Sequence, residues 1–218
     1  MKKLLTFQWL LGAVLLAGLW MVPTAAEAQT VRLAVISESA SSWPLYVAEA
    51  KGLFEAQGVT VNVTVTRSSS KQLQALEKGD FDIGHQAADH IIKAVEGGSE
   101  LFIVMALNRP DQSIVTAPTI NSFQDLKGKA LAVDAAGSGY VLLLKRILAQ
   151  KGVKEGEYTI KEVGGSNDRY EAIKSGSVAA GLLSQPHDLK LLSEGFKSLG
   201  STSEYFPHYQ GSVAATKR

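Results

Sequence analysis

Short apolar segments alternate along this chain with segments of helical spacing, and this alternation restricts the possible folds more than any other feature of the sequence. Residues 31–36 are apolar and β-branched, as strands are, and residues 43–57 carry apolar side chains at helical spacing. Val59–Val65 then alternates valine with polar residues, which is typical of a strand with one exposed face. The chain therefore opens as a β-α-β unit.

The alternation continues in two runs, separated by an extended stretch that contains proline. The first run predicts helices over 68–79 and 87–95, a strand over 81–84 and a buried strand over 101–107. The second predicts strands over 130–133, 158–163, 178–183 and 196–199, with helices over 138–150 and 168–174. Two such runs predict an α/β fold of two lobes with largely parallel sheets, and a small-molecule site in the cleft where the strands end.

The first 28 residues have the pattern of a secretory signal peptide. Lys2 and Lys3 precede an apolar run over 10–22, and an Ala-Glu-Ala cleavage site ends at Ala28. An uncleaved membrane anchor is the alternative, but the apolar run is short for a bilayer span. We expect cleavage after Ala28 and export to a bacterial periplasm.

The composition excludes several classes of partner and site. Removing 28 of the 218 residues leaves 190, enough for one sizeable core or two small ones. Loss of Lys2, Lys3 and Glu27 reduces 22 basic and 21 acidic residues to 20 of each, so the mature net charge is near zero. This balance gives no electrostatic basis for binding nucleic acid or an anionic membrane. Cysteine is absent, which excludes disulfides and thiolate metal sites.

Several segments resemble the nitrate/sulfonate/taurine-type (NMT1/THI5-like) substrate-binding proteins of ABC importers. They include a serine-rich loop after the first strand, a Gly-Asp-Phe-Asp-Ile-Gly turn and strand, and an Asp-Leu-Lys-Gly-Lys entry to the second run. The matching segments are 37–48, 51–54, 76–84, 125–133, 162–165 and 170–176. The resemblance spans about residues 31–216 and implies a two-lobed periplasmic binding protein type II fold. Such a protein closes around a small solute and delivers it to a membrane permease.

The resemblance also implies a division of the chain. Residues 29–117 are expected to form lobe 1, residues 118–205 lobe 2, and residues 206–218 a return segment to lobe 1. Members of the family normally continue past the strand expected here over 211–215, adding helices that complete lobe 1. We therefore expect a truncated chain, with a shortened variant as the alternative. In either case apolar sheet surface is left in water, at a cost of about 25 cal/mol per Å².

In lobe 1, polar side chains follow three strands at the edge where the cleft is expected. Hydroxyl, carboxylate and imidazole groups there can hydrogen-bond a solute, and an indole ring can stack on a planar one. Each also has a plainer role as a helix cap, a solvated turn or a structural histidine. The candidate ligand-binding residues are Ser37, Glu38, Ser39, Trp43, Ser68, Ser69, His85 and Gln86.

In lobe 2, the most informative stretch is the loop over 134–140, where a strand ends, two glycines follow and a helix begins. Free backbone N–H groups at such a helix start can face the oxygen atoms of a ligand. The loop is neither a phosphate-binding P-loop nor a full dinucleotide-binding fingerprint, because it lacks the lysine ending and the third glycine. The candidates are Asp134, Ser138, Gly139, Tyr140 and, after a later strand, Gln185.

We expect a monomeric binding protein without cofactor or metal. The alternative is an enzyme of thiamine-pyrimidine or menaquinone biosynthesis on the same fold, which the signal peptide disfavours. The sequence contains no G-x-S-x-G elbow and no H-E-x-x-H motif. His85 and His90, without cysteine, give no convincing metal spacing.

The identity of the solute stays open in the sequence. Basic side chains near expected loops, from Arg67, Lys71 and Arg109, favour a sulfonate, nitrate or carboxylate. The opposite set of Glu38, Asp134 and Trp43 favours a cationic or planar heterocycle such as a thiamine-type pyrimidine. Neither set dominates.

Overall fold

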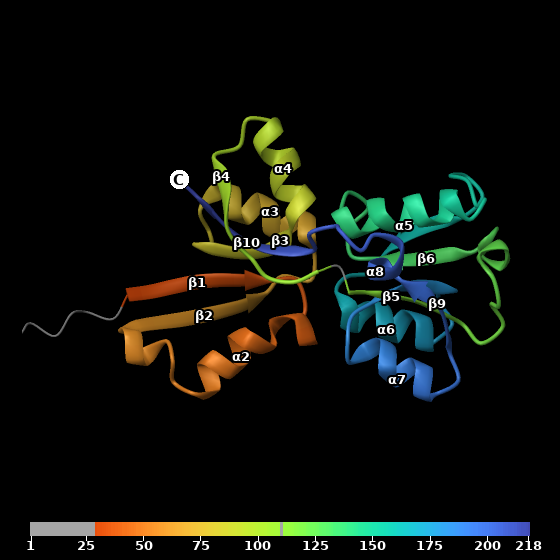
Figure 1. Cartoon of the computed structure of the whole chain (residues 1–218), viewed down its shortest axis with the longest axis horizontal. Helices are drawn as coiled ribbons and strands as arrows, with labels where there is room; N and C mark the ends of the chain where they lie inside the picture. Colours follow the sequence, from red (N-terminus) through yellow and green to blue (C-terminus); the bar gives the residue numbers. More distant parts are fainter. Residues whose placement is uncertain (1–28, 110) are drawn as a thin grey trace, which may run out of the picture.

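The computed structural model describes the protein over residues 29–109 and 111–218, where it forms two α/β lobes side by side (Figure 1). Each lobe holds a five-stranded sheet with helices on both faces. The two-lobed α/β fold expected from the sequence is confirmed. The expected signal peptide and its cleavage site lie outside the described residues. Across the described part of the chain, every helix is too short or too polar to cross a membrane.

Lobe 1 is built on a sheet of order β2-β1-β3-β10-β4, in which β10 runs antiparallel to both of its neighbours. Helices α3 and α4 cover one face, and α2 lies on the other beside β1 and β2 (Figure 1). The strands are β1 (Gln29–Val35), β2 (Val59–Val65), β3 (Ile83–Ala87), β4 (Leu101–Ala106) and β10 (Ser212–Lys217), and the helices are α2 (Trp43–Ala50), α3 (Ser69–Lys78) and α4 (Ala88–Glu96).

Lobe 2 is built on a sheet of order β7-β6-β8-β5-β9, in which β5 runs antiparallel to both of its neighbours. Helix α5 covers one face, and α6 and α7 cover the other (Figure 1). The strands are β5 (Ser113–Thr116), β6 (Ala130–Val133), β7 (Thr159–Glu162), β8 (Ala180–Leu183) and β9 (Lys197–Ser201), and the helices are α5 (Gly139–Gln150), α6 (Ser166–Lys174), α7 (His187–Ser193) and α8 (Thr202–Tyr205).

The two sheets share one topology, which the chain builds by crossing between the lobes twice. In each sheet the second, first and third strands of a run lie in that order, and one antiparallel strand separates them from the fourth. The antiparallel strand is the one that arrives from the other lobe, β5 in lobe 2 and β10 in lobe 1. Because β5 pairs with β8 and β9, the chain changes sheets before residue 113, earlier than the lobe boundary expected at 117.

Three of the expected elements differ clearly in bounds or burial, and β5, α7 and α8 were not predicted from the sequence. Helix α2 ends at Ala50 and not at residue 57, because Gly52 turns the chain with a φ of 64° that favours glycine. Strand β3 begins two residues later than expected and runs to Ala87, since its parallel pairing with β1 joins Ile83 to Leu33. The expectation that residues 101–107 form a buried strand is wrong, because β4 is an edge strand with only its first residue, Leu101, buried.

Apolar helix faces packed on the sheets form the cores. In lobe 2, α5 buries Leu144, Ile147 and Leu148, at the spacing of one helix face, against the sheet. In lobe 1, Leu76 and Ile91 of α3 and α4 form one small cluster on the sheet. A second, smaller cluster lies under α2, around Leu45. The larger core is therefore that of lobe 2.

Candidate functional site

A narrow cavity lies between the lobes, where β1, β3, β6 and β8 end. Its volume of about 70 Å³ is room for a small polar group, since one water takes about 30 Å³ in the liquid. Both lobes contribute side chains to its wall, as a cleft between them requires. Seven of the residues predicted from the sequence line it: Ser37, Ser39, Ser69, His85, Asp134, Ser138 and Tyr140.

Six predicted residues lie outside this cavity. Glu38 and Trp43 line a separate groove on the outer side of the cleft. Gln185 lies at another opening, where its carbonyl accepts a hydrogen bond from the Ala40 N–H of lobe 1 at 2.9 Å. Ser68 caps α3. The remaining two, Gln86 and Gly139, face other protein groups.

A chain of buried side chains holds Gln86 in a contact between the lobes. Its Nε2 donates to the carbonyl of Ser69 at 2.7 Å and lies 3.2 Å from Nδ1 of His90. Nε2 of His90 lies 2.6 Å from the carbonyl oxygen of Gly137 in lobe 2. Because a carbonyl only accepts, His90 donates from Nε2 and accepts at Nδ1. Gln86 therefore supports the packing of lobe 1 on lobe 2, where the sequence analysis had assigned it to the solute.

Gly139 lies where α4 of lobe 1 meets the start of α5 in lobe 2. A Cβ atom at Gly139 would overlap the carboxylate of Asp89 in α4. Gly139 therefore packs against a protein side chain, and the Asp89 carboxylate would have to move to make room for a Cβ. Within the described residues, the buried Oδ1 of Asp89 has no hydrogen-bond partner.

Asp134 reaches across the cleft to the N-terminus of α3. Its Oδ2 accepts a hydrogen bond from the Ser69 N–H at 3.1 Å, and the positive end of the helix dipole favours the carboxylate. The Ser69 N–H is thus occupied by a carboxylate of lobe 2. The Ser69 hydroxyl is buried and finds no partner among the described residues, so it is available to a molecule in the cavity.

Arg169 is the charged cavity residue that was not among the candidates predicted from the sequence. The other polar lining residues that were not predicted are Ser41, Ser42, Asn108, Gln112, Ser184 and Ser212. The side chain of Arg169 is 5% exposed, and it donates from Nε to the carbonyl of Leu182 at 2.7 Å and from Nη1 to that of Gly164 at 2.9 Å. These bonds fix the guanidinium plane, and no bond from Nη2 is found over the described part of the chain. Burial lowers the pKa of Arg169, which Asp134 and Asp168 oppose, but an arginine stays protonated in proteins.

The other polar groups around Arg169 act as neutral hydrogen-bonding groups near pH 7. Burial lowers the pKa of His85, so its imidazole is uncharged, and burial raises the pKa of Tyr140 to about 12, so its phenol keeps its proton. Arg169 and Asp134 are therefore the charged side chains in the cavity wall. Among the described residues, no three histidine or carboxylate side chains are placed to hold a metal ion.

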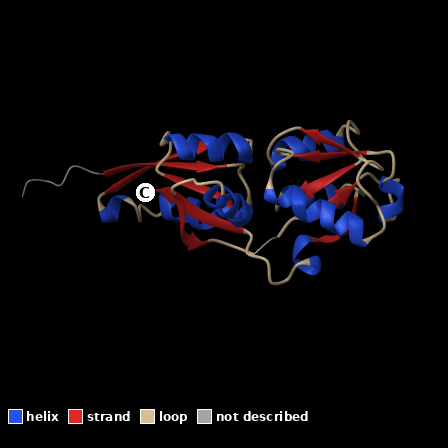
Figure 2. Cartoon of the chain, turned by 90° about the horizontal axis from the view of Figure 1, so that it is seen from above, coloured by secondary structure: helices blue, strands red, loops and turns tan. Residues whose placement is uncertain are grey.

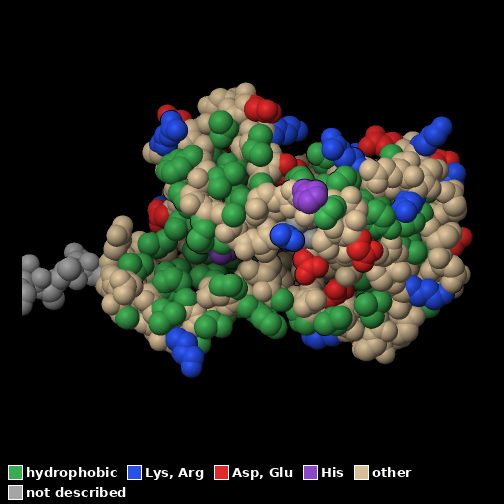
Figure 3. All heavy atoms as spheres, in the orientation of Figure 1, with side chains coloured by type: hydrophobic (Ala, Val, Ile, Leu, Met, Phe, Trp, Pro, Cys, Tyr) green, Lys and Arg blue, Asp and Glu red, His purple; other side chains and the backbone are tan. Residues whose placement is uncertain are grey.

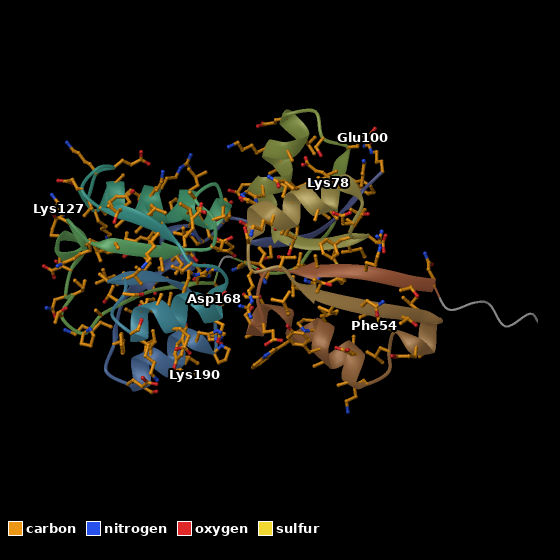
Figure 4. The ribbon with its side chains drawn as sticks, turned by 180° about the vertical axis from the view of Figure 1, so that it is seen from behind. Phe54, Lys78, Glu100, Lys127, Asp168 and Lys190 are labelled. Carbon is orange, nitrogen blue, oxygen red and sulfur yellow. The ribbon has the colours of Figure 1, made fainter. Side chains whose placement is uncertain are left out.

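An exposed ion pair closes one side of the cleft. Nη1 of Arg67, which follows β2, lies 3.4 Å from Oδ1 of Asp168 at the start of α6. Figure 4 shows Asp168 on the side of lobe 2 that faces lobe 1. Arg67 has a φ of 61°, a left-handed conformation that is uncommon for a residue other than glycine. The pair links the two lobes at the surface.

Comparison with solved structures shows the same fold. An alkanesulfonate-binding protein of Xanthomonas axonopodis pv. citri, bound to MOPS, superposes with a TM-score of 0.73 at 24% identity, over 88% of this chain and 67% of that one. A Bordetella bronchiseptica protein gives a TM-score of 0.77 at 24% identity, over 88% of this chain and 64% of that one. The nitrate-binding protein NrtA of Synechocystis gives a TM-score of 0.72 at 18% identity, over 88% of this chain and 56% of that one. The likeness establishes the periplasmic binding protein type II fold.

Curated relatives cover a shorter part of the chain. Binding proteins of Brucella abortus and Brucella melitensis are 27% identical over 139 residues, which is 63% of this chain and 43% of theirs. The chain thus spans less than half the length of these relatives. The sequence model of the family described as NMT1/THI5 like matches residues 39–209, most of the described chain. On this match, the chain belongs to the NMT1/THI5-like family.

Proposed function

We propose that this protein is an exported, monomeric solute-binding protein that captures a small organic anion between its lobes and delivers it to the permease of an ABC importer. The single observation that carries the proposal is Arg169, a buried guanidinium in the wall of the cavity between the lobes. Two structural neighbours are named as alkanesulfonate-binding and nitrate-binding proteins, which supports an anion as the solute. A buried cation without a bonded carboxylate is costly, and an anionic solute removes that cost.

The groups around Arg169 suit the oxygen atoms of a sulfonate or carboxylate. The fixed guanidinium plane can donate two parallel hydrogen bonds to such a group. Ser69, with its buried hydroxyl, and Tyr140, with its protonated phenol, supply further donors from the two lobes. Because the donors come from both lobes, a bound anion stabilises the closed arrangement over an open one.

The test is calorimetry of the exported protein with ethanesulfonate, nitrate and acetate. We expect at least one to bind, and Arg169→Gln to weaken its binding by a factor of about 10 or more, as loss of a charge-assisted hydrogen bond implies. Arg169→Lys keeps the charge but loses the planar fork, so it restores part of the affinity. Arg146→Gln is the matched control, since Arg146 is exposed on α5 and does not line the cavity.

Two results would contradict the proposal. One is equal affinity in wild type and a folded Arg169→Gln variant. The other is turnover of a bound solute by the purified protein, which would favour the biosynthetic-enzyme alternative. Cleavage after Ala28 belongs to the same proposal, and mass spectrometry of periplasmic protein tests it, since an intact Met1 would oppose export with cleavage.

A further inference from the structure

A second hollow opens beside the cavity, on the outer side of the cleft. We call it the outer groove, and its volume is about 270 Å³. Lobe 1 forms one wall with Glu38, Trp43 and Tyr46, and lobe 2 forms the other with Asn167, Pro186 and His187. Ser39 lines both the groove and the cavity, so the two spaces adjoin.

The outer groove contains a buried polar group without a partner. His187 is 8% exposed, yet its Nδ1 has no hydrogen-bond partner among the described residues. Burial lowers the pKa of His187, and the charges of Lys190 and Arg169 lower it further, so the ring is neutral. A neutral imidazole nitrogen can donate or accept. Nδ1 itself is buried and does not open to the groove, so His187 contributes an uncharged imidazole ring to the groove wall.

Two aromatic side chains, Trp43 and Tyr46, line the lobe 1 wall of the outer groove. Trp43, the first residue of α2, is 62% exposed, although indole rings are usually well buried. Tyr46 lies one helical turn further on and lines the same groove. Two aromatic side chains facing an imidazole provide stacking surfaces for a planar ring. Glu38, exposed at the same opening, supplies a carboxylate that accepts from a ring N–H or amino group.

From this arrangement we infer that the outer groove is a specificity subsite for a planar aromatic ring carried by the solute, with the anionic group of the same solute on Arg169. The inference rests on the proposed function for the anionic end of the solute, and it adds an aromatic ring as the chemical class of the other end of the solute. The cavity of about 70 Å³ holds the anionic group. The ring extends past Ser39 into the groove and contacts both lobes. The solute class is an aryl sulfonate or aryl carboxylate, with a ring donor toward Glu38.

The chain offers a specific optical probe of the outer groove. Of its three tryptophans, Trp9 and Trp20 lie in the first 28 residues, so protein that begins at Gln29 contains Trp43 alone. The experiment compares benzenesulfonate with ethanesulfonate, and benzoate with acetate, by calorimetry and by tryptophan emission. We expect the aryl member of the pair that binds to bind about tenfold more tightly, as an aromatic contact implies, and to change the emission.

Substitutions then locate the effect in the outer groove. Trp43→Ala is expected to remove the aryl preference and leave ethanesulfonate or acetate affinity unchanged, while Trp43→Phe keeps most of the preference. Val47→Ala, on the exposed surface of α2 outside the groove lining, is the control. Adding an amino group, as in 4-aminobenzenesulfonate, is expected to tighten binding to wild type and not to a Glu38→Gln variant.

The outcomes separate this inference from the proposed function. Equal affinities within each ligand pair, or a Trp43→Ala variant that weakens both members equally, overturn the subsite while anion binding at Arg169 stands. Failure of every anion to bind wild type overturns the proposed function and the subsite with it. An aryl preference that persists in Trp43→Ala places the ring elsewhere and also overturns the inference.

Discussion

Lobe 1 and lobe 2 have the same sheet topology but different cores. In lobe 2 the buried apolar clusters contain 13 and 6 residues, whereas in lobe 1 they contain 6 and 3. Of the exposed large apolar side chains in the described chain, only Leu142 and Leu189 belong to lobe 2. Figure 3 shows hydrophobic side chains gathered on lobe 1, at the left of the view. Shared strand order therefore does not bring equal burial.

The difference is concentrated at β4 of lobe 1. Phe102, Ile103, Val104 and Met105 are 37–55% exposed. Successive residues of a strand point to opposite faces, so this edge strand is left partly uncovered on both faces, while α2 lies over β1 and β2 (Figure 1). The corresponding edge strand of lobe 2, β9, is followed directly by α8, whose Tyr205 packs against the lobe 2 core. Strands can thus be paired in a sheet without helices covering both faces of every strand. We expect the stability of each lobe to increase with the amount of apolar side-chain surface that its helices bury.

The largest expected effect is the difference between truncating a buried side chain of lobe 2 and truncating an exposed apolar side chain of lobe 1. Leu148→Ala in lobe 2 removes a fully buried side chain and should lower the free energy of unfolding by about 2–5 kcal/mol. Met105→Ala in lobe 1 removes a side chain that is 55% exposed, and should change it by about 0.5 kcal/mol or less. Urea denaturation of both variants measures the free energy of unfolding. Equal decreases in the two variants would contradict the difference in burial between the lobes.

The second prediction separates the unfolding of the lobes in one experiment. Trp43, the tryptophan of lobe 1, reports that lobe by fluorescence, whereas far-UV circular dichroism reports both lobes. Because lobe 1 has the smaller core, its fluorescence transition should precede the dichroism transition in urea. Coincident transitions would instead indicate that the interlobe contacts make the two lobes unfold as one unit.

The third prediction concerns the contact that joins the lobes at Gly139. Gly139→Val should push α5 away from Asp89 and weaken solute binding by about 1 kcal/mol or more, since the closed arrangement depends on that approach. Gly137→Ala is the control, because a Cβ there meets only Ser70 Oγ at 4.0 Å. Asp89→Ala in the Gly139→Val background should restore binding, and a double variant as weak as the single one would argue against this contact.

The smallest effect is a pH dependence of lobe 1. Burial lowers the pKa of His85 in the folded state, so below its ordinary value of about 6.5 the unfolded chain binds more protons. Stability should therefore fall as the pH drops through 6.5, and the His85→Gln variant should lose less over that range. His208, exposed in the second crossing segment, gives the control variant His208→Gln. An unchanged slope in His85→Gln would assign the dependence to other groups.

Much of the fold follows from local patterns in the sequence. The alternation of valine in Val59–Val65 and the apolar face of residues 139–150 are periodic, so strands and helices could be predicted near their observed bounds. The position of β4 was predicted as well, but its exposure could not be, because an apolar run has the same pattern whether or not a helix covers it. The end of α2 depends on Gly52, which a helical pattern tolerates and only the backbone conformation reveals.

The position of the candidate site could be predicted from the sequence, but the chemical groups that line it could be predicted only in part. Residues after strand ends, such as Ser37 and Asp134, line the cavity because the topology brings those ends together. Gln86 also follows this rule, yet it is turned into a hydrogen-bonded chain that only tertiary packing creates. Arg169 sits in the first turn of a helix whose sequence resembles a solvated one. Its burial depends on the carbonyls of Gly164 and Leu182, which no local pattern places.

The double crossing between the lobes has a mechanical consequence. A single linker lets two bodies rotate about three axes, but two connections join the lobes here, one from β4 to β5 and one from α8 to β10 (Figure 2). Each passage ends in a strand held between two others, β5 or β10, so neither end can slide. Two bodies joined at two anchored points rotate most easily about the line through those points. For the closure proposed above, we therefore expect a single hinge axis, which would bring the same wall residues together each time.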